Sequence, residues 1–188
     1  RYALSSKWRT FLAISGKDVR EILGLTFSRN GSDAQGWFNR ACSFKTAAEL
    51  LGAKAESSLA IAYYFNAGLS IELILKAVAI AKGKNFDANH RLNDLCVNTA
   101  IKFTKDQACT LELFSEIIVW LGRYPTPKNE GQWDNYHDVV LEKHIVQERE
   151  GNTFKTIANK GRFPTLENYL KIWGLCEEEY KNTLINPT

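Results

Sequence analysis

The chain has 188 residues, of which 45% are hydrophobic and 24% charged, and its formal net charge is +3. This length suits one domain with a substantial core, and the composition argues against a disordered or low-complexity chain. The modest charge argues against a dedicated binder of duplex DNA. Four cysteines stand far apart without a C-x-x-C spacing, so we expect free thiols, a reducing compartment and a cytoplasmic location.

Residues 1–32 are basic, with six Lys or Arg side chains against Asp18 and Glu21. We expect an N-terminal extension or flap of two short helices, followed by a single domain at 33–188. The basic face of the extension is either a solvated arm or a contact for phosphate or for an acidic surface of another subunit.

Apolar residues recur at helical spacing through most of the remaining chain. The spacing predicts helices at 33–52, 57–82, 89–101 and 105–121, and a last helix that Thr165 caps. Between 123 and 164 the pattern weakens into an amphipathic stretch at 139–148 and a loop at 150–164, and long connections of this kind are often functional. No segment alternates convincingly like a strand. We therefore predict an all-α fold, an up-and-down helical bundle of four to five main helices with a long excursion before the last helix.

The helix at 57–82 is almost uncharged until Glu72, but polar residues such as Asn66 and Ser70 interrupt the apolar run. These residues argue against a membrane span, and a helix that is apolar on nearly every face belongs in the middle of a bundle. Glu72 and Lys76 are four residues apart, acid before base. The two can pair along one helix edge, for about 0.2–0.5 kcal/mol if exposed.

Four motifs follow one another along the chain: A-x-S-F-K-T-A-A-E-L-L at 41–51, S-I-E-L-I-L-K-A at 70–77, H-R-L-N-D-L at 90–95 and R-Y-P at 123–125. Their order resembles that of HEPN domains, the "higher eukaryotes and prokaryotes nucleotide-binding" helical bundles, over about residues 33–127. The resemblance implies a bundle that commonly dimerises and often works with RNA or nucleotides. Many relatives serve in toxin–antitoxin or phage-defence systems.

The nuclease members of that family carry an Arg followed, after four to six residues, by His. None of His90, His137 and His144 has an Arg at this spacing before it. We therefore carry over no catalytic residue and expect a non-catalytic module without a cofactor that binds RNA, a nucleotide or a partner protein. The candidate binding residues are Lys76, His90, Arg91, Arg123 and Tyr124. We further expect a homodimer formed through the apolar bundle faces, an antitoxin-like protein as a possible partner, and no membrane contact.

Two alternatives stay open. The chain is a divergent, metal-independent endoribonuclease in which His90 transfers a proton and Arg123 stabilises the developing phosphorane, or it is a purely structural bundle that binds other proteins. The His90 ring either hydrogen-bonds Glu72 in a functional site or simply fixes the connection between two helices. Arg123 and Tyr124 either offer a guanidinium fork and a stacking face to a nucleotide or lock the end of a helix.

Other chemistries lack their usual marks. His137 and His144 lie two turns apart, near Asp134 and Asp138, whereas a metal site prefers an i, i+4 pair with further ligands, so we expect no metal. The sequence contains no G-x-x-x-x-G-K-[ST], G-x-G-x-x-G or G-x-S-x-G motif, which argues against P-loop, dinucleotide-binding and hydrolase chemistry.

Overall fold

The structure is a computed structural model that describes residues 15–54, 56–86 and 89–186. The chain divides into two compact units, Arg1–Asp33 and Ala34–Thr188. In the first unit, α1 (Gly16–Ile22) begins at a capping box between Ser15 and Asp18, and α2 (Phe27–Gly31) follows. These are the two short helices that the sequence predicts, and the part of the extension before residue 15 lies outside the described residues.

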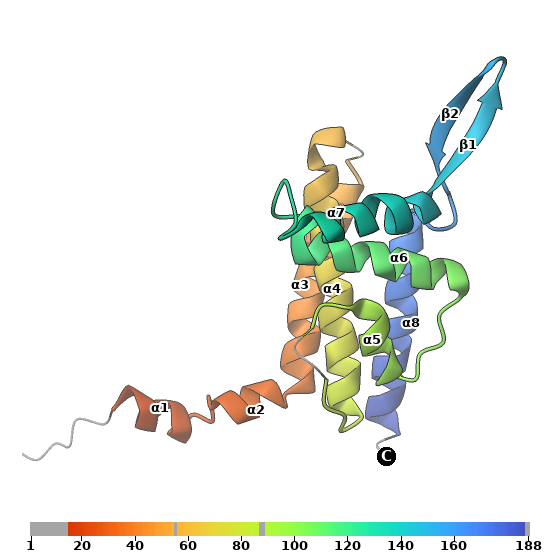
Figure 1. Cartoon of the computed structure of the whole chain (residues 1–188). Coiled ribbons are helices and arrows are strands. Elements are labelled where there is room, and N and C mark those ends of the chain that lie inside the picture. Colours follow the sequence, from red (N-terminus) through yellow and green to blue (C-terminus); the bar gives the residue numbers. More distant parts are fainter. Residues whose placement is uncertain (1–14, 55, 87–88, 187–188) are drawn as a thin grey trace, which may run out of the picture. The chain divides into compact units, whose positions relative to one another are not determined.

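The second unit is mostly helical (Figure 1). Its elements are α3 (Ala34–Gly52), a 3-10 turn (Ser57–Leu59) that leads into α4 (Ala60–Ala81), α5 (Leu92–Val97), α6 (Lys105–Glu116) with a π-helical continuation (Ile117–Leu121), α7 (Glu130–Asn135) with a π-helical turn (Tyr136–Val140) and a 3-10 turn (Leu141–His144), β1 (Ile145–Glu150), β2 (Thr153–Ala158) and α8 (Leu166–Ile185).

Helix α4 is the most deeply buried element of the described chain, and α3, α5, α6 and α8 pack against it (Figure 1). Gly68 permits close contact with α6, because a Cβ at this position would lie 2.9 Å from Cγ2 of Ile118. By length and composition alone the segment Ser57–Ala81 could cross a membrane, and 67% of its most apolar window is buried inside the protein. The prediction of a long central helix is confirmed.

The predicted helix at 89–101 is shorter than expected. It begins at Leu92 and ends at Val97, and Ala100 has a φ of 62°, in the left-handed region that an α-helix cannot include. Thr99 closes the turn, because its hydroxyl donates to the carbonyl of Cys96 at 2.8 Å and accepts from the amide of Ile101 at 3.3 Å. A polar turn therefore replaces the last helical turn that the apolar spacing predicted.

The all-α prediction is also wrong in one place, because residues 145–158 form an antiparallel hairpin of β1 and β2. The strands pair from Ile145 with Ala158 to Glu150 with Thr153. The loop between them has two residues, and Gly151, with a φ of 63°, occupies the first position, as in type II′ hairpin turns. Both faces of the hairpin are largely exposed, so no alternation of apolar and polar residues marks the strands in the sequence.

Candidate functional site

Glu72, Lys76 and His90 form a polar group on the side of α4, which we call the Glu72 cluster. The carboxylate of Glu72 accepts a hydrogen bond from Nζ of Lys76 at 2.5 Å, and Nδ1 of His90 lies 2.9 Å from its Oε2. Both contacts were expected from the sequence and both are confirmed. The pair does not lie on an exposed helix edge, however, because Glu72 is 2% exposed and Lys76 is 7% exposed.

The ammonium group of Lys76 is enclosed by internal partners. In addition to its ion pair, Nζ lies 5.7 Å from the ring centroid of Trp37 and 5.1 Å from that of Phe86. Cation–π contacts of this kind are strongest where water is excluded. The structure therefore directs the charge of Lys76 toward the core, and not toward a phosphate in solvent.

His90 and Arg91 lie at the outer side of the cluster. The His90 side chain is about half exposed, at 49%, and Arg91 is exposed. The amide of Arg91 donates to Oδ1 of Asn89 at 3.1 Å, and the amide of Leu92 donates to the hydroxyl of Ser115 on α6 at 3.0 Å. The contact between His90 and Glu72 thus helps to fix the start of α5 against α4 and α6.

Arg123 and Tyr124 lie together just after the π-helical end of α6. The Arg123 guanidinium carbon lies 5.2 Å from the ring centroid of Tyr124, and an Nη2–H donates to the carbonyl of Val119. The contact with Val119 satisfies a carbonyl at a helix C-terminus, as the helix-locking interpretation requires. The contact with Tyr124 leaves a guanidinium over an aromatic ring at the surface, because Arg123 is exposed and Tyr124 is 56% exposed.

Sequence reasoning missed a series of aromatic contacts that begins at Trp120, four residues before Tyr124. The amide of Tyr124 donates to the carbonyl of Trp120 at 2.8 Å, and the ring of Trp120 lies 6.1 Å from that of Trp133 on α7. Trp133 in turn lies 4.4 Å from the ring of His137. The buried Trp120 is thus linked to Tyr124 through the backbone and to Trp133 through its ring, and we call Arg123, Tyr124, Trp133 and His137 the aromatic patch. The i, i+4 spacing of Trp133 and His137 was the available signal.

The structure does not bring the two groups of predicted residues together. Gly122, before Arg123, packs on Phe65 of α4, because a Cβ at Gly122 would lie 2.8 Å from Cδ2 of Phe65. His90 instead contacts Glu72, seven residues further along the same helix, a rise of about 10 Å. The His90 ring is bonded to Glu72 and the Arg123 guanidinium to Val119, so neither points to a shared phosphate position.

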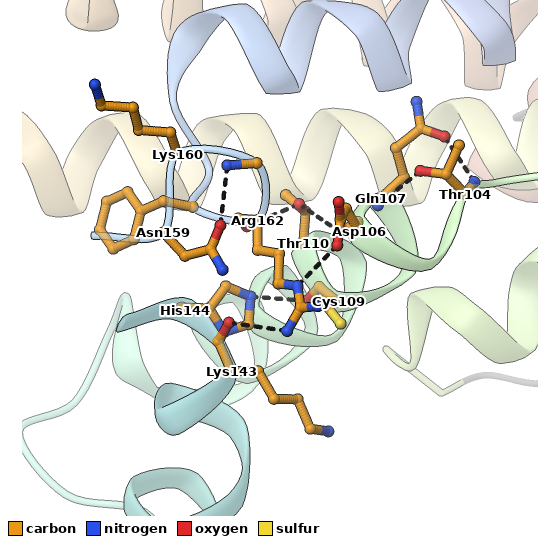
Figure 2. Close-up of polar contacts among 12 residues, drawn as sticks. Thr104, Asp106, Gln107, Cys109, Thr110, Lys143, His144, Asn159, Lys160 and Arg162 are labelled. Carbon is orange, nitrogen blue, oxygen red and sulfur yellow. Dashed lines mark hydrogen bonds and ion pairs between the residues drawn. The ribbon is translucent and has the colours of Figure 1, made fainter. Parts of the chain in front are cut away.

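His144 is fully buried between α6 and the π-helical turn after α7. Its Nδ1 lies 2.8 Å from the carbonyl oxygen of Val140, and its Nε2 lies 3.0 Å from that of Cys109 (Figure 2). Burial lowers the pKa of His144, and the two carbonyls oppose that effect. His137, the other residue of the possible metal pair, has its ring tilted at 50° against that of Trp133. The described residues contain no group of three or more side chains placed to hold a metal ion.

No family model matches this chain, and no curated protein or solved structure matches it.

Proposed function

We propose that the chain is a HEPN-like helical bundle that binds a nucleotide or single-stranded RNA without cleaving it, and that the aromatic patch forms the binding surface. The observation that carries this proposal is the exposed Arg123 guanidinium over the exposed Tyr124 ring, followed on α7 and the turn after it by the exposed rings of Trp133 and His137. Proteins recognise unpaired bases by stacking them on aromatic rings and guanidinium planes, while cationic groups hold the phosphates. The patch offers aromatic rings and a guanidinium, and both of its halves contact Trp120.

The Glu72 cluster supports the family part of the proposal. The two most specific motifs of the resemblance, E-L-x-L-K-A at 72–77 and H-x-L-x-x-L at 90–95, meet in space through the hydrogen bond between His90 and Glu72. Because this contact joins a residue of one motif to a residue of the other, it explains why the two motifs occur together in this order along the chain. In this proposal the cluster holds the bundle together, and the bound RNA lies at the aromatic patch.

The alternative of a ribonuclease needs His90 and Arg123 at one phosphate. Their present partners favour binding over cleavage, because each side chain is held by a separate part of α4 or α6. The same assay distinguishes the two functions, since cleavage in metal-free buffer that His90→Ala abolishes is expected only of the enzyme.

The test is fluorescence anisotropy of a labelled single-stranded RNA of mixed sequence, with the recovered RNA resolved on a gel. The variant that combines Arg123→Ala and Tyr124→Ala removes one charge and one stacking ring. Loss of a stacked base costs about 1–3 kcal/mol, so Kd should rise at least about five-fold. Adenosine monophosphate serves as the competitor that reports nucleotide binding.

The matched control combines Phe27→Ala and Arg29→Ala in the first unit. Phe27 is 98% exposed and Arg29 is exposed, so this variant loses the same charge and an exposed ring elsewhere in the chain. The control should bind like the wild type. Equal losses in both variants would mean general electrostatic binding. Absence of binding at about 100 μM protein, the weak end of sequence-independent affinity, would refute the proposed function.

A further inference from the structure

The hairpin of β1 and β2 stands apart from the helices that carry it (Figure 1), and none of its strand residues is buried. Ten of its twelve strand residues are exposed, and Phe154 at its outer end is 70% exposed. A lone two-stranded hairpin is at best marginally stable in water, and an open strand edge is a template for another strand. The outer edge of each strand therefore carries backbone N–H and C=O groups that a further strand could pair with.

The base of the hairpin is held firmly in place. The amide of Asn159 donates to the carbonyl of His144 at 2.8 Å, which extends the ladder by one pair toward the helices. Beyond it, Nε of Arg162 donates to Asp106 on α6 at 2.8 Å, and the hydroxyl of Thr110 donates to the carbonyl of Arg162 at 2.8 Å (Figure 2). These contacts tie the segment after β2 to α6, so the hairpin is a preorganised arm.

The register shows which backbone groups are unpaired. In a two-residue hairpin the pair next to the loop, here Glu150 with Thr153, is hydrogen-bonded, and bonded and non-bonded pairs then alternate. The hydrogen bond from the amide of Asn159 to the carbonyl of His144 fits this alternation of bonded and non-bonded pairs. The amides and carbonyls of Phe154, Thr156 and Ala158 consequently face the outer edge of β2, where a further strand would lie.

We propose that β2 pairs with β2 of a second copy of this chain, antiparallel and centred on Thr156, to form a four-stranded sheet. In this register Thr156 lies opposite Thr156 of the second copy, Lys155 opposite Ile157, and Phe154 opposite Ala158. No like charges meet, and the exposed Phe154 ring covers the small Ala158 of the other chain. The Lys155 stem lies along Ile157 with its ammonium group in water.

The outer edge of β1 is more highly charged than that of β2, with Glu148, Arg149 and Glu150 in succession against Lys155 alone. A β1 register centred on Glu148 or Arg149 places like charges directly opposite each other, and one centred on Gln147 places Glu148 and Arg149 opposite the apolar Val146 and Ile145. Charges of this kind are the usual protection of an edge strand. The two edges of one hairpin therefore differ in charge, and we assign the dimer contact to the less charged edge, β2, instead of the apolar bundle faces that the sequence suggested.

The test compares proline at the same level of the two edges. Thr156 and Gln147 are cross-strand partners at a non-bonded pair, so Thr156→Pro and Gln147→Pro each remove an outward amide and leave the hairpin ladder intact. Light scattering after size exclusion should give twice the chain mass of 21.3 kDa for the wild type and Gln147→Pro, and the single mass for Thr156→Pro. Circular dichroism at the helical minimum checks that each variant is folded.

A second measurement reports the register independently of proline. Residues opposite each other at a bonded antiparallel pair lie about 5.5 Å apart between Cα atoms, within the range of a disulfide. Oxidised Thr156→Cys should run as a covalent dimer on a non-reducing gel, and oxidised Lys155→Cys should not. A monomeric wild type, a dimeric Thr156→Pro, equal dissociation of both proline variants, or equal cross-linking of both cysteine variants would each overturn the proposal.

Discussion

Two of the cations that lie over aromatic rings, Lys76 and Arg123, differ in burial. Lys76 is 7% exposed and lies between Glu72, Trp37 and Phe86, whereas Arg123 is exposed and lies over Tyr124 at the surface. The sequence assigned both cations to one binding surface. Their surroundings assign them to different tasks, because a buried cation is held by internal partners and an exposed one remains available to a phosphate.

The difference also predicts different costs of mutation. Removing one member of a buried ion pair leaves the other charge without a partner in a medium of low polarity, which is strongly unfavourable. Removing an exposed charge returns its neighbours to water at little cost. Three variants, taken from the largest expected effect to the smallest, test this comparison, and a further double variant serves as a control for the first.

Glu72→Ala should have the largest effect. It leaves Lys76 buried without its counterion and removes the acceptor of His90, so the free energy of unfolding should fall by about 3–5 kcal/mol. Urea denaturation followed by circular dichroism measures it. Glu112→Ala is the control, because the pair of Glu112 with Lys143 is only partly buried, and its cost should stay below about 1 kcal/mol.

A double variant separates the unpaired charge from simple loss of packing. Glu72→Leu combined with Lys76→Met replaces the ion pair by apolar groups of similar size, an exchange that is often close to neutral. The double variant should therefore be more stable than Glu72→Ala. If the two were equally unstable, the cost would come from packing around α4 and not from the charge of Lys76.

Lys76→Met should have an intermediate effect. Glu72 keeps its hydrogen bond to the half-exposed His90, and the Met side chain retains contact with Trp37 and Phe86, so we expect a loss of about 1–2 kcal/mol. RNA affinity should remain at the wild-type value in the anisotropy assay. A ten-fold loss of affinity in a folded Lys76→Met protein would instead restore Lys76 to the binding surface.

The long helices could be predicted because their signals are local and strong. The run from Ala60 to Ala81 has almost no charge, and Thr165 caps α8 as expected, since its hydroxyl accepts from the amide of Asn168 at 3.2 Å. Contact between Glu72 and His90 was also predictable, because α4 and the start of α5 are adjacent in the chain. The degree of burial was not, because an i, i+4 pair has the same spacing on an exposed or a buried face.

The features that sequence reasoning missed depend on contacts between segments or on an absent pattern. The hairpin has no buried face, so it lacks the alternation by which a strand is recognised. In the aromatic patch Tyr124 meets Trp120 through a local backbone hydrogen bond, whereas only the fold brings Trp133 of α7 to Trp120. Neither the spacing of Trp120 and Trp133 in the sequence nor the composition of the chain indicates that their rings are in contact.

The smallest effect on stability is expected from Arg123→Ala and Tyr124→Ala, the same pair whose loss should weaken RNA binding most. Both residues are exposed, so the double variant should change the free energy of unfolding by less than about 0.5 kcal/mol. The single variant Arg123→Ala distinguishes the two contacts of Arg123, one with Val119 and one with Tyr124. A fall of more than about 1 kcal/mol in the free energy of unfolding, without a change in RNA affinity, would show that the role of Arg123 is to cap the helix through Val119. Unchanged stability with weakened binding would leave the stacked, solvent-facing guanidinium as the functional contact, in contrast to the enclosed ammonium group of Lys76.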